Sequence, residues 1–173
     1  MFFVATAPCL DSSGNGGHVN VSPKGYRHTF AVLDPRRVAY LDLTGSGAET
    51  IAHLRQNGRI TLLFCSFDAT PAILRIYGSG KVVVPAGLEW PEVASHLAPE
   101  QAGKGTDRGC RRAIIVVAVD RIADSCGYAV PIMEAVQERD LLARWSERKS
   151  AEDLKAYRVR HNTESIDGLP ALP

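Results

Sequence analysis

Hydroxyl and glycine residues gather between residues 44 and 50, where they offer the donors that a phosphate group needs. In chain order they are Thr44, Gly45, Ser46, Gly47 and Thr50. We expect a helix to begin near Gly47, because Ser46 and Glu49 have the spacing of a capping box. A helix N-terminus attracts anions through its free N–H groups and its dipole. The segment therefore predicts a phosphate site, or only a capped helix start.

A second group of candidates, Ser22, Pro23 and Lys24, closes the alternating segment 18–22. At this strand end Lys24 would balance the charge of a phosphate, or it would be a solvated lysine in a turn. Arg75 lies within an otherwise apolar stretch. A strand-interior arginine needs an acidic partner or a ligand where its face is buried, and needs neither where that face is open to water.

Other common site patterns are missing from the sequence. The five histidines show no metal-ligand spacing, the four cysteines form no Cys-x-x-Cys pair, and neither GxGxxG nor GxxxxGK occurs. Cys110 stands among three arginines, whose charge favours a reactive thiolate, but no histidine and acid partners it at a telling spacing. We therefore predict no metal site, name no catalytic side chain and expect free thiols.

Composition limits the classes of protein to which the chain can belong. Its 173 residues suit one domain, and 20 Lys and Arg against 19 Asp and Glu leave a net charge of +1. Such a balance gives no general attraction to nucleic acid or to anionic membranes. The N-terminus has no basic n-region, and no apolar run reaches the length of a membrane span. These features predict a cytoplasmic protein without nucleic-acid or membrane partners.

The elements that must position the candidates are mainly strands. Apolar alternation and turn residues predict strands near residues 2–7, 18–22, 29–33, 38–43, 60–65, 73–84 and 113–119, the last continuing toward 128. Helices are expected near residues 47–57 and 89–97, around 141–145, and from Ser150, where Asp153 completes a capping box. Gly78 and Gly80 indicate a bulge or bend in the long strand. Six or seven short strands with one inserted helix predict a small antiparallel barrel with helices.

Several of these segments together resemble a known family. They are residues 1–8, 17–25, 42–47 with Glu49 and Thr50, 73–78, 125–128, and the tail with Asn162 and 165–170. The chain resembles the pyridoxamine 5′-phosphate oxidase-like family of FMN-binding split barrels, and within it a bacterial and fungal subgroup whose substrates are unassigned.

The resemblance implies a mainly β, α+β fold: a six-stranded antiparallel split β-barrel with a crossover helix and C-terminal helices. Residues 1–173 would form one domain, with the barrel over about 1–128 and the helices and tail over 129–173. The family forms homodimers that hold FMN between the subunits. Carried over by position, the cofactor-binding residues would be Ser22, Pro23, Lys24, Asp42, Thr44, Gly45, Ser46, Gly47, Thr50 and Arg75.

Two departures from the family pattern bear on function. Thr50 stands where many relatives carry a basic residue, and Glu49 lies beside it, so Lys24, Arg75 or a partner-subunit arginine would have to supply the missing charge. The tail lacks the Trp-Arg-Leu stretch of genuine pyridoxamine phosphate oxidases, so that reaction is not expected. The prediction is an FMN-binding oxidoreductase with a small-molecule substrate. The alternatives are a non-catalytic flavin, deazaflavin or haem carrier or sensor dimer, and a dimer that has lost its cofactor.

Overall fold

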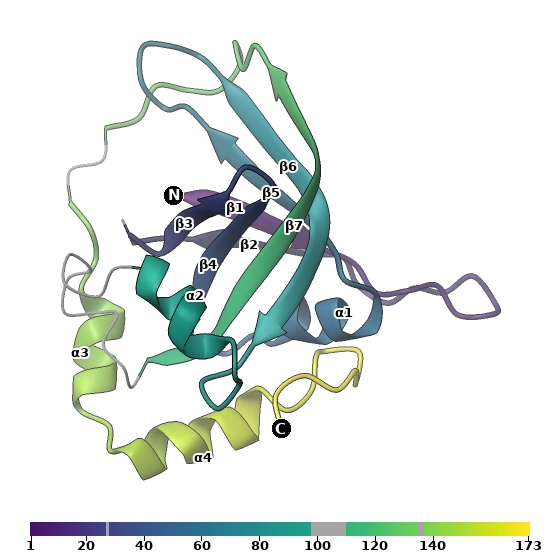
Figure 1. Cartoon of the computed structure of the whole chain (residues 1–173), viewed down its shortest axis with the longest axis vertical. Helices are drawn as coiled ribbons and strands as arrows, with labels where there is room; N and C mark the ends of the chain where they lie inside the picture. Colours follow the sequence, from purple (N-terminus) through teal and green to yellow (C-terminus); the bar gives the residue numbers. More distant parts are fainter. Residues whose placement is uncertain (27, 98–109, 135–136) are drawn as a thin grey trace.

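The computed structural model describes residues 1–26, 28–97, 110–134 and 137–173 (Figure 1). Its elements, in chain order, are β1 (Phe2–Thr6), β2 (Asn20–Lys24), β3 (Phe30–Asp34), β4 (Arg37–Leu43), α1 (Glu49–Asn57), β5 (Arg59–Cys65), β6 (Ile73–Val83), α2 (Trp90–His96), β7 (Arg111–Ser125), α3 (Leu141–Glu147) and α4 (Ala151–His161). The predicted strands and helices are therefore present, with ends that differ by a few residues.

All seven strands belong to one antiparallel sheet in the order β2-β1-β5-β6-β7-β4-β3. The antiparallel split-barrel architecture is confirmed, but the sheet has seven strands rather than six and is not closed. Among the described residues no ladder joins the two edge strands, β2 and β3. Pro23 lies in β2 opposite Phe3, where its missing N–H costs no ladder bond because β2 is an edge.

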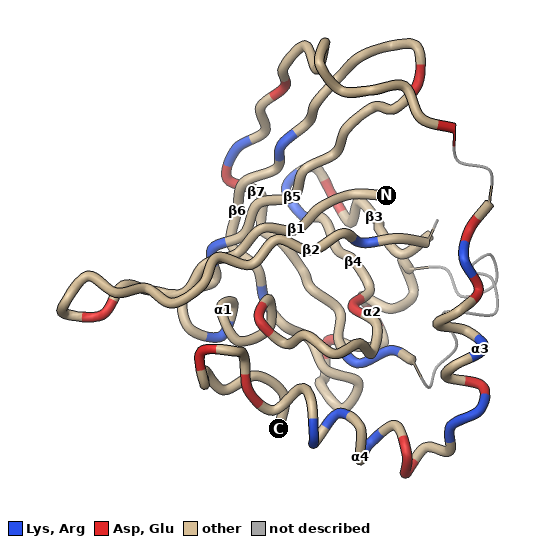
Figure 2. The backbone as a smooth tube through the Cα atoms, turned by 180° about the vertical axis from the view of Figure 1, so that it is seen from behind, with Lys and Arg blue, Asp and Glu red and all other residues tan. Residues whose placement is uncertain are grey.

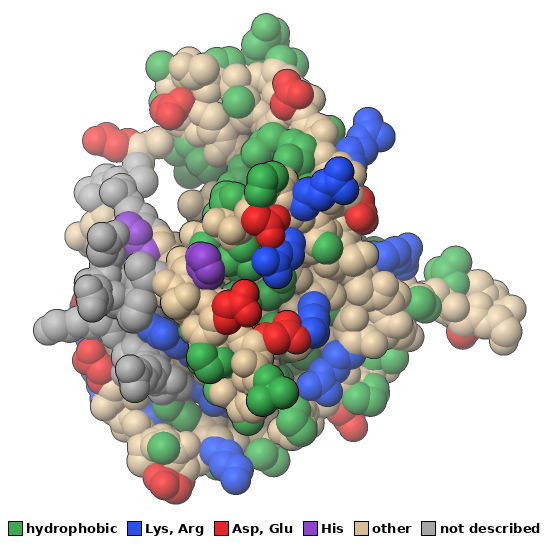
Figure 3. Space-filling view, viewed as in Figure 1, with side chains coloured by type: hydrophobic (Ala, Val, Ile, Leu, Met, Phe, Trp, Pro, Cys, Tyr) green, Lys and Arg blue, Asp and Glu red, His purple; other side chains and the backbone are tan. Residues whose placement is uncertain are grey.

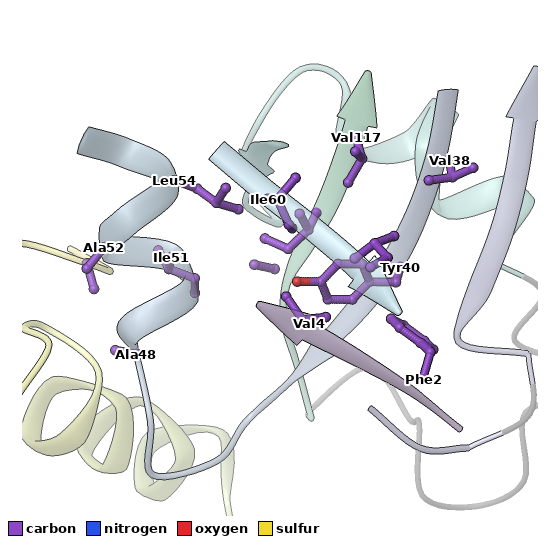
Figure 4. Close-up of a cluster of buried hydrophobic side chains, with 14 of the residues drawn as sticks. Phe2, Val4, Val38, Tyr40, Ala48, Ile51, Ala52, Leu54, Ile60 and Val117 are labelled. Carbon is purple, nitrogen blue, oxygen red and sulfur yellow. The ribbon is translucent and has the colours of Figure 1, made fainter. Parts of the chain in front are cut away.

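The main core fills the concave side of the curled sheet and is capped by α1. Figure 4 shows Ile51 and Leu54 of α1 directed toward Val4, Tyr40 and Ile60 of the strands, and all five residues are buried. Four aromatic rings, Phe2, Phe30, Tyr40 and Phe64, meet at one end of this core with centroids 5.1–5.5 Å apart. Three of these contacts are edge-to-face and the contact of Phe2 with Phe64 is stacked, and both arrangements add to the stabilisation from buried apolar area. Because α1 packs on this core, the position of its N-terminus relative to the sheet is fixed.

A smaller cluster covers the convex side, where Val93 and Leu97 from α2 and its C-cap pack on Ala39, Leu41 and Ile114. Strand β4 is thus buried on both faces, as its almost continuous apolar sequence requires. Asp42, the one acidic residue of β4, lies on its interior face and is therefore buried deep in the molecule.

Two capping boxes were predicted, and the structure contains one of them. At α4 the Ser150 hydroxyl accepts a bond from the Asp153 N–H, and the Asp153 carboxylate accepts one from the Ser150 N–H, both at 3.1 Å. The box predicted at Ser46 is wrong: α1 begins at Glu49 after Ala48, and among the described residues no side chain caps it. The chain before α1 is held by other contacts, described below, and Ser46 is exposed.

The predicted irregularity in the long strand is confirmed. The pairing of β6 with β7 shifts register between Tyr77 and Gly78. A Cβ atom at Gly78 would lie 2.1 Å from the carbonyl oxygen of Ala118, which only a glycine avoids. The bulge bends the sheet and helps to bring its edges toward each other.

The tail after α4 is not a free extended segment. It turns back on itself through a bridge between Glu164 and Pro170, and Ala171 and Leu172 are buried in the main core. Figure 1 shows α4 and the tail passing along the end of the sheet that α1 covers. Along α4 the acidic residues lie in the first turn and the basic residues toward the last (Figure 2), so the helix does not present a surface of one charge. None of the helices in the described part of the chain has the length and apolar character that crossing a membrane requires.

Candidate functional site

Asp42 lies at the centre of a buried ion-pair cluster. Its side chain is 1% exposed and accepts bonds from Lys24 Nζ at 3.0 Å and from Arg112 Nε at 2.7 Å. Lys24 comes from the edge strand β2, Asp42 from β4 and Arg112 from β7. The pair of Lys24 and Asp42 therefore bridges the split of the barrel, where backbone pairing stops.

The charges of the cluster determine the protonation of Asp42. Burial alone would raise the pKa of its carboxyl, but the positive charges of Lys24 and Arg112 outweigh burial and hold the pKa below its ordinary value. Burial, reinforced by Asp42, raises the pKa of the neighbouring Tyr40 well above its ordinary value, so its phenol stays neutral. Lys24 Nζ also lies 5.9 Å from the centre of the Tyr40 ring. Asp42 is thus an anion that faces two cations.

The loop between β4 and α1, residues 44–48, is fixed next to this cluster. The N–H and hydroxyl of Thr44 both donate to the Cys110 carbonyl, at 2.8 and 2.9 Å. Arg158 Nε of α4 donates to the Thr44 hydroxyl oxygen at 3.0 Å. The Gly45 carbonyl accepts from Arg112 at 3.2 Å and from the Asn162 side chain at 2.8 Å.

Arg158 brings a third cation to this place. Burial lowers the pKa of its guanidinium, and the nearby charge of Arg112 acts in the same direction, although arginine stays protonated. The two guanidinium groups therefore repel each other across the loop. Three cationic side chains, Lys24, Arg112 and Arg158, thus contact either Asp42 or the adjoining loop.

A row of polar side chains continues the cluster along the interior face of β2. Asn20 donates to the Thr50 hydroxyl of α1 at 2.9 Å and to that of Thr6 at 3.3 Å. Thr6 in turn contacts the fully buried His53, whose pKa burial lowers, so that the imidazole is neutral at pH 7. The hydroxyl of Ser22, between Asn20 and Lys24, is buried and has no hydrogen-bond partner among the described residues.

The structure brings together only part of the predicted set. Ser22, Lys24, Asp42, Thr44, Gly45 and Thr50 lie on the interior side of the split or on the loop that borders it. Pro23, Ser46 and Gly47 are exposed. The Glu49 carboxylate folds back over Gly47, since a Cβ atom there would lie 2.7 Å from its oxygen.

Arg75 is remote from this cluster. It pairs with Ala123 of β7, whereas Asp42 pairs with Ala113, ten residues earlier on the same strand. Ten residues of strand span roughly 33 Å. Arg75 instead donates to the Ser125 hydroxyl at 3.2 Å. Within one subunit it therefore supplies no charge to the cluster, and its role as a cofactor ligand stays a prediction that requires a second subunit.

Four residues of this site were not among the predicted ligands: Asn20, Arg112, Arg158 and Asn162. Asn162 belonged to a segment that carried the family resemblance, and Arg112 stood in the basic stretch around Cys110. Asn20 likewise lay in such a segment, 17–25, whereas nothing in the local sequence distinguished Arg158, whose partner Thr44 comes from another part of the chain.

The curled sheet, left open between β2 and β3 and bridged there by buried polar side chains, defines a split-barrel protein. A family model described as pyridoxamine 5′-phosphate oxidase matches residues 2–126. The pyridoxamine 5′-phosphate oxidase family protein ustO of Aspergillus flavus is 39% identical over 191 residues, which cover 99% of this chain and 70% of that protein. The chain therefore belongs to the pyridoxamine 5′-phosphate oxidase family.

Solved structures share the fold at low sequence identity. The crystal structure of HupZ from Group A Streptococcus has a TM-score of 0.50 and 22% identity, over 72% of this chain and 88% of HupZ. An FMN-binding protein from Syntrophomonas wolfei gives a TM-score of 0.48 and 15% identity, over 71% of this chain and 75% of that protein. At 22% identity the likeness to HupZ concerns the fold alone.

Proposed function

We propose that the chain is an FMN-binding oxidoreductase whose cofactor phosphate binds beside the loop 44–48. The observation that carries this proposal is the convergence of cationic side chains beside the loop. Lys24 and Arg112 contact Asp42, Arg112 also contacts Gly45, and Arg158 contacts Thr44. Charge-assisted hydrogen bonds are stronger than neutral ones, so a dianionic phosphate would be stabilised where two guanidinium groups converge on one loop.

The residues present fit such a ligand. Arginine forks suit phosphate oxygens, and the Ser22 hydroxyl is a buried polar group that still lacks a partner. The α1 N-terminus contributes less than the sequence suggested, because Glu49 folds over Gly47 at this end of the helix. In this proposal Arg112 and Arg158 take the place of the basic residue that is missing at position 50.

Within this site the chain itself would bind and orient the cofactor. Arg112 and Arg158 would hold the phosphate, while Asp42 keeps Lys24 and Arg112 in place and limits the net charge. Neutral amide and hydroxyl groups along β2, from Asn20 to Ser22, would meet the polar parts of the ligand. When bound, FMN supplies the electron-transfer chemistry, so no side-chain acid or base is required of the protein.

We propose further that the chain forms a homodimer in the cytoplasm, with the cofactor between its subunits. Its substrate would be a small molecule. The homodimer is supported by large apolar side chains that are exposed in the single chain. Among them are Val21 on β2, Val32 on β3, Tyr77 on β6 and Ile122 on β7. Figure 3 shows apolar side chains on the face that β6 and β7 present, mixed with charged ones. A second copy would also bring its own Arg75 to the assembly.

The substrate would differ from pyridoxamine 5′-phosphate. In place of the Trp-Arg-Leu stretch, the tail carries residues 166–170, and Asp167 of this segment is engaged by His18. The tail therefore offers no arginine for a substrate phosphate at this position.

The first test is the visible absorbance spectrum of the purified protein, with mass identification of any chromophore released by denaturation. Titration with FMN should show binding that Arg158→Gln weakens by roughly 10- to 100-fold, because a bond to a charged group contributes about 1.5–3 kcal/mol. Arg144→Gln, which removes an exposed pair with Asp140, is the matched control and should bind FMN normally.

The outcomes separate the candidate functions. Reduction of the bound flavin by NADH or NADPH, followed by reoxidation, would establish an oxidoreductase, whereas a flavin that does not turn over indicates a carrier or sensor. A deazaflavin or haem spectrum would replace FMN as the cofactor. A colourless protein that takes up no FMN would overturn the proposal in favour of a dimer that has lost its cofactor.

A further inference from the structure

We infer that the segment 162–172, here called the C-terminal strap, positions the loop 44–48 for the cofactor, and that Asn162 is its positioning residue. The inference deepens the proposed function, because it assigns a task in that site to a part of the chain that follows the barrel.

Asn162 holds the loop from a fully buried position. Its side-chain amide donates to the Gly45 carbonyl at 2.8 Å, and it is 0% exposed. Its backbone is fixed independently, since its N–H donates to the Arg158 carbonyl at 2.7 Å and its carbonyl accepts from the Leu172 N–H at 2.9 Å. The amide therefore has a fixed direction, and the loop carbonyl is held against it.

The strap is itself anchored in the core. Ala171 and Leu172 belong to the main buried cluster, together with Ala48 and Ala52 of α1. Figure 4 shows the tail beside Ala48 and Ala52, at the end of α1 that adjoins the loop. Movement of the strap would therefore be transmitted to the start of α1 as well as to Gly45.

The turn in the middle of the strap contacts the segment that leads into β2, the second wall of the site. The Asp167 carboxylate accepts from the His18 N–H at 2.8 Å and contacts the His18 ring at 2.7 Å. Gly17 permits this approach, because a Cβ atom there would lie 2.5 Å from the Asp167 oxygen. Because His18 stands two residues before β2, the strap links the loop that borders the site to the strand that carries Ser22 and Lys24.

The choice of asparagine at position 162 is not explained by stability alone. Its side-chain oxygen is buried and has no hydrogen-bond donor among the described residues. A buried acceptor without a partner is unfavourable, and a leucine of similar size would avoid that cost. An asparagine at this place is thus explained by the bond to Gly45, which sets the loop, rather than by packing.

The test compares Asn162→Leu with Asn57→Leu. Asn57 is a matched control, since its side chain also donates to a backbone carbonyl, that of Ala7 at 2.9 Å, but at the C-terminal end of α1, away from the loop. Amide hydrogen exchange of residues 44–48 reports on the loop without any cofactor. FMN affinity and the circular dichroism of bound flavin report on the site.

We expect Asn162→Leu to speed exchange in residues 44–48 at least tenfold, to weaken FMN binding about five- to tenfold, and to alter the flavin dichroism. Asn57→Leu should leave all three unchanged. Exchange and affinity that match the wild type in Asn162→Leu would overturn the inference. If the wild type binds no FMN, the proposed function fails, and the exchange experiment alone decides whether the strap positions the loop.

Discussion

Replacing Asp42 by asparagine should destabilise the fold more than any exposed charge change, because it leaves two buried cations without their anion. Lys24 is 18% exposed and Arg112 6%, against 1% for Asp42. Breaking a buried pair of this kind costs about 3–5 kcal/mol. For a domain of this size each kcal/mol corresponds to about 2–4 °C, so the melting temperature should fall by roughly 6–20 °C.

Urea denaturation at neutral pH measures the loss, and repeating it at low pH tests its cause. The Asp42 pKa lies below its ordinary 3.8 in the folded state, so the stabilisation is present above pH 3.8 and disappears as the pH falls through the lowered folded value. Protonated Asp42 resembles asparagine, and the gap between wild type and Asp42→Asn should therefore shrink in acid.

Asp34→Asn provides the control, because Asp34 pairs with Arg37 at the surface. It should leave the melting temperature nearly unchanged, and the small effect that remains should vanish in 1 M salt, whereas the effect of Asp42→Asn should persist. A loss below about 1 kcal/mol for Asp42→Asn, or a gap that does not narrow in acid, would refute the description of a buried charge cluster.

Three further changes test the positioning elements. Thr50→Val keeps the shape of the side chain but removes the acceptor for Asn20, and urea denaturation should show a loss of about 1–2 kcal/mol; an unchanged midpoint would deny the contact between α1 and β2. Gly78→Ala places a Cβ atom 2.1 Å from the Ala118 oxygen and should cost about 3 kcal/mol, so a stable variant would contradict the bulge. Ser150→Ala removes the cap of α4 and should cost about 1 kcal/mol, seen as a fall of roughly 2–4 °C in the melting temperature. Ser150→Thr is its control and should melt like the wild type.

Features that depend on a few neighbouring residues were predicted well. The box at Ser150 and the bulge at Gly78 were both found, because capping and glycine-dependent register shifts involve local geometry. The same reasoning failed at Ser46, although its spacing to Glu49 is identical. There, long-range bonds to Thr44 and Gly45 hold the preceding chain, and the helix starts only after Ala48.

The charge cluster was predicted only in part, because its contacts join residues that lie far apart in the chain. Arg112 is 70 residues from Asp42, and Asn162 is 117 residues from Gly45. The register of β4 against β7 brings the first pair together, and the return of the tail brings the second. Sequence spacing reveals neither contact. The sequence therefore indicated that a basic residue was missing, whereas the fold brings Arg112 and Arg158 to the site.

The burial of Ala171 and Leu172 beside α1 has a consequence for the order in which the protein is made. Domains tend to fold from the N-terminus while synthesis continues. Here the strands can all be present, yet the wall of the site at Gly45 stays unsupported until Asn162 and Leu172 have left the ribosome. During that interval the nascent chain would present the loop 44–48 without the strap. A chain that ends before residue 162 should therefore keep its sheet, yet lose the support of this loop and, under the proposed function, the ability to bind the cofactor.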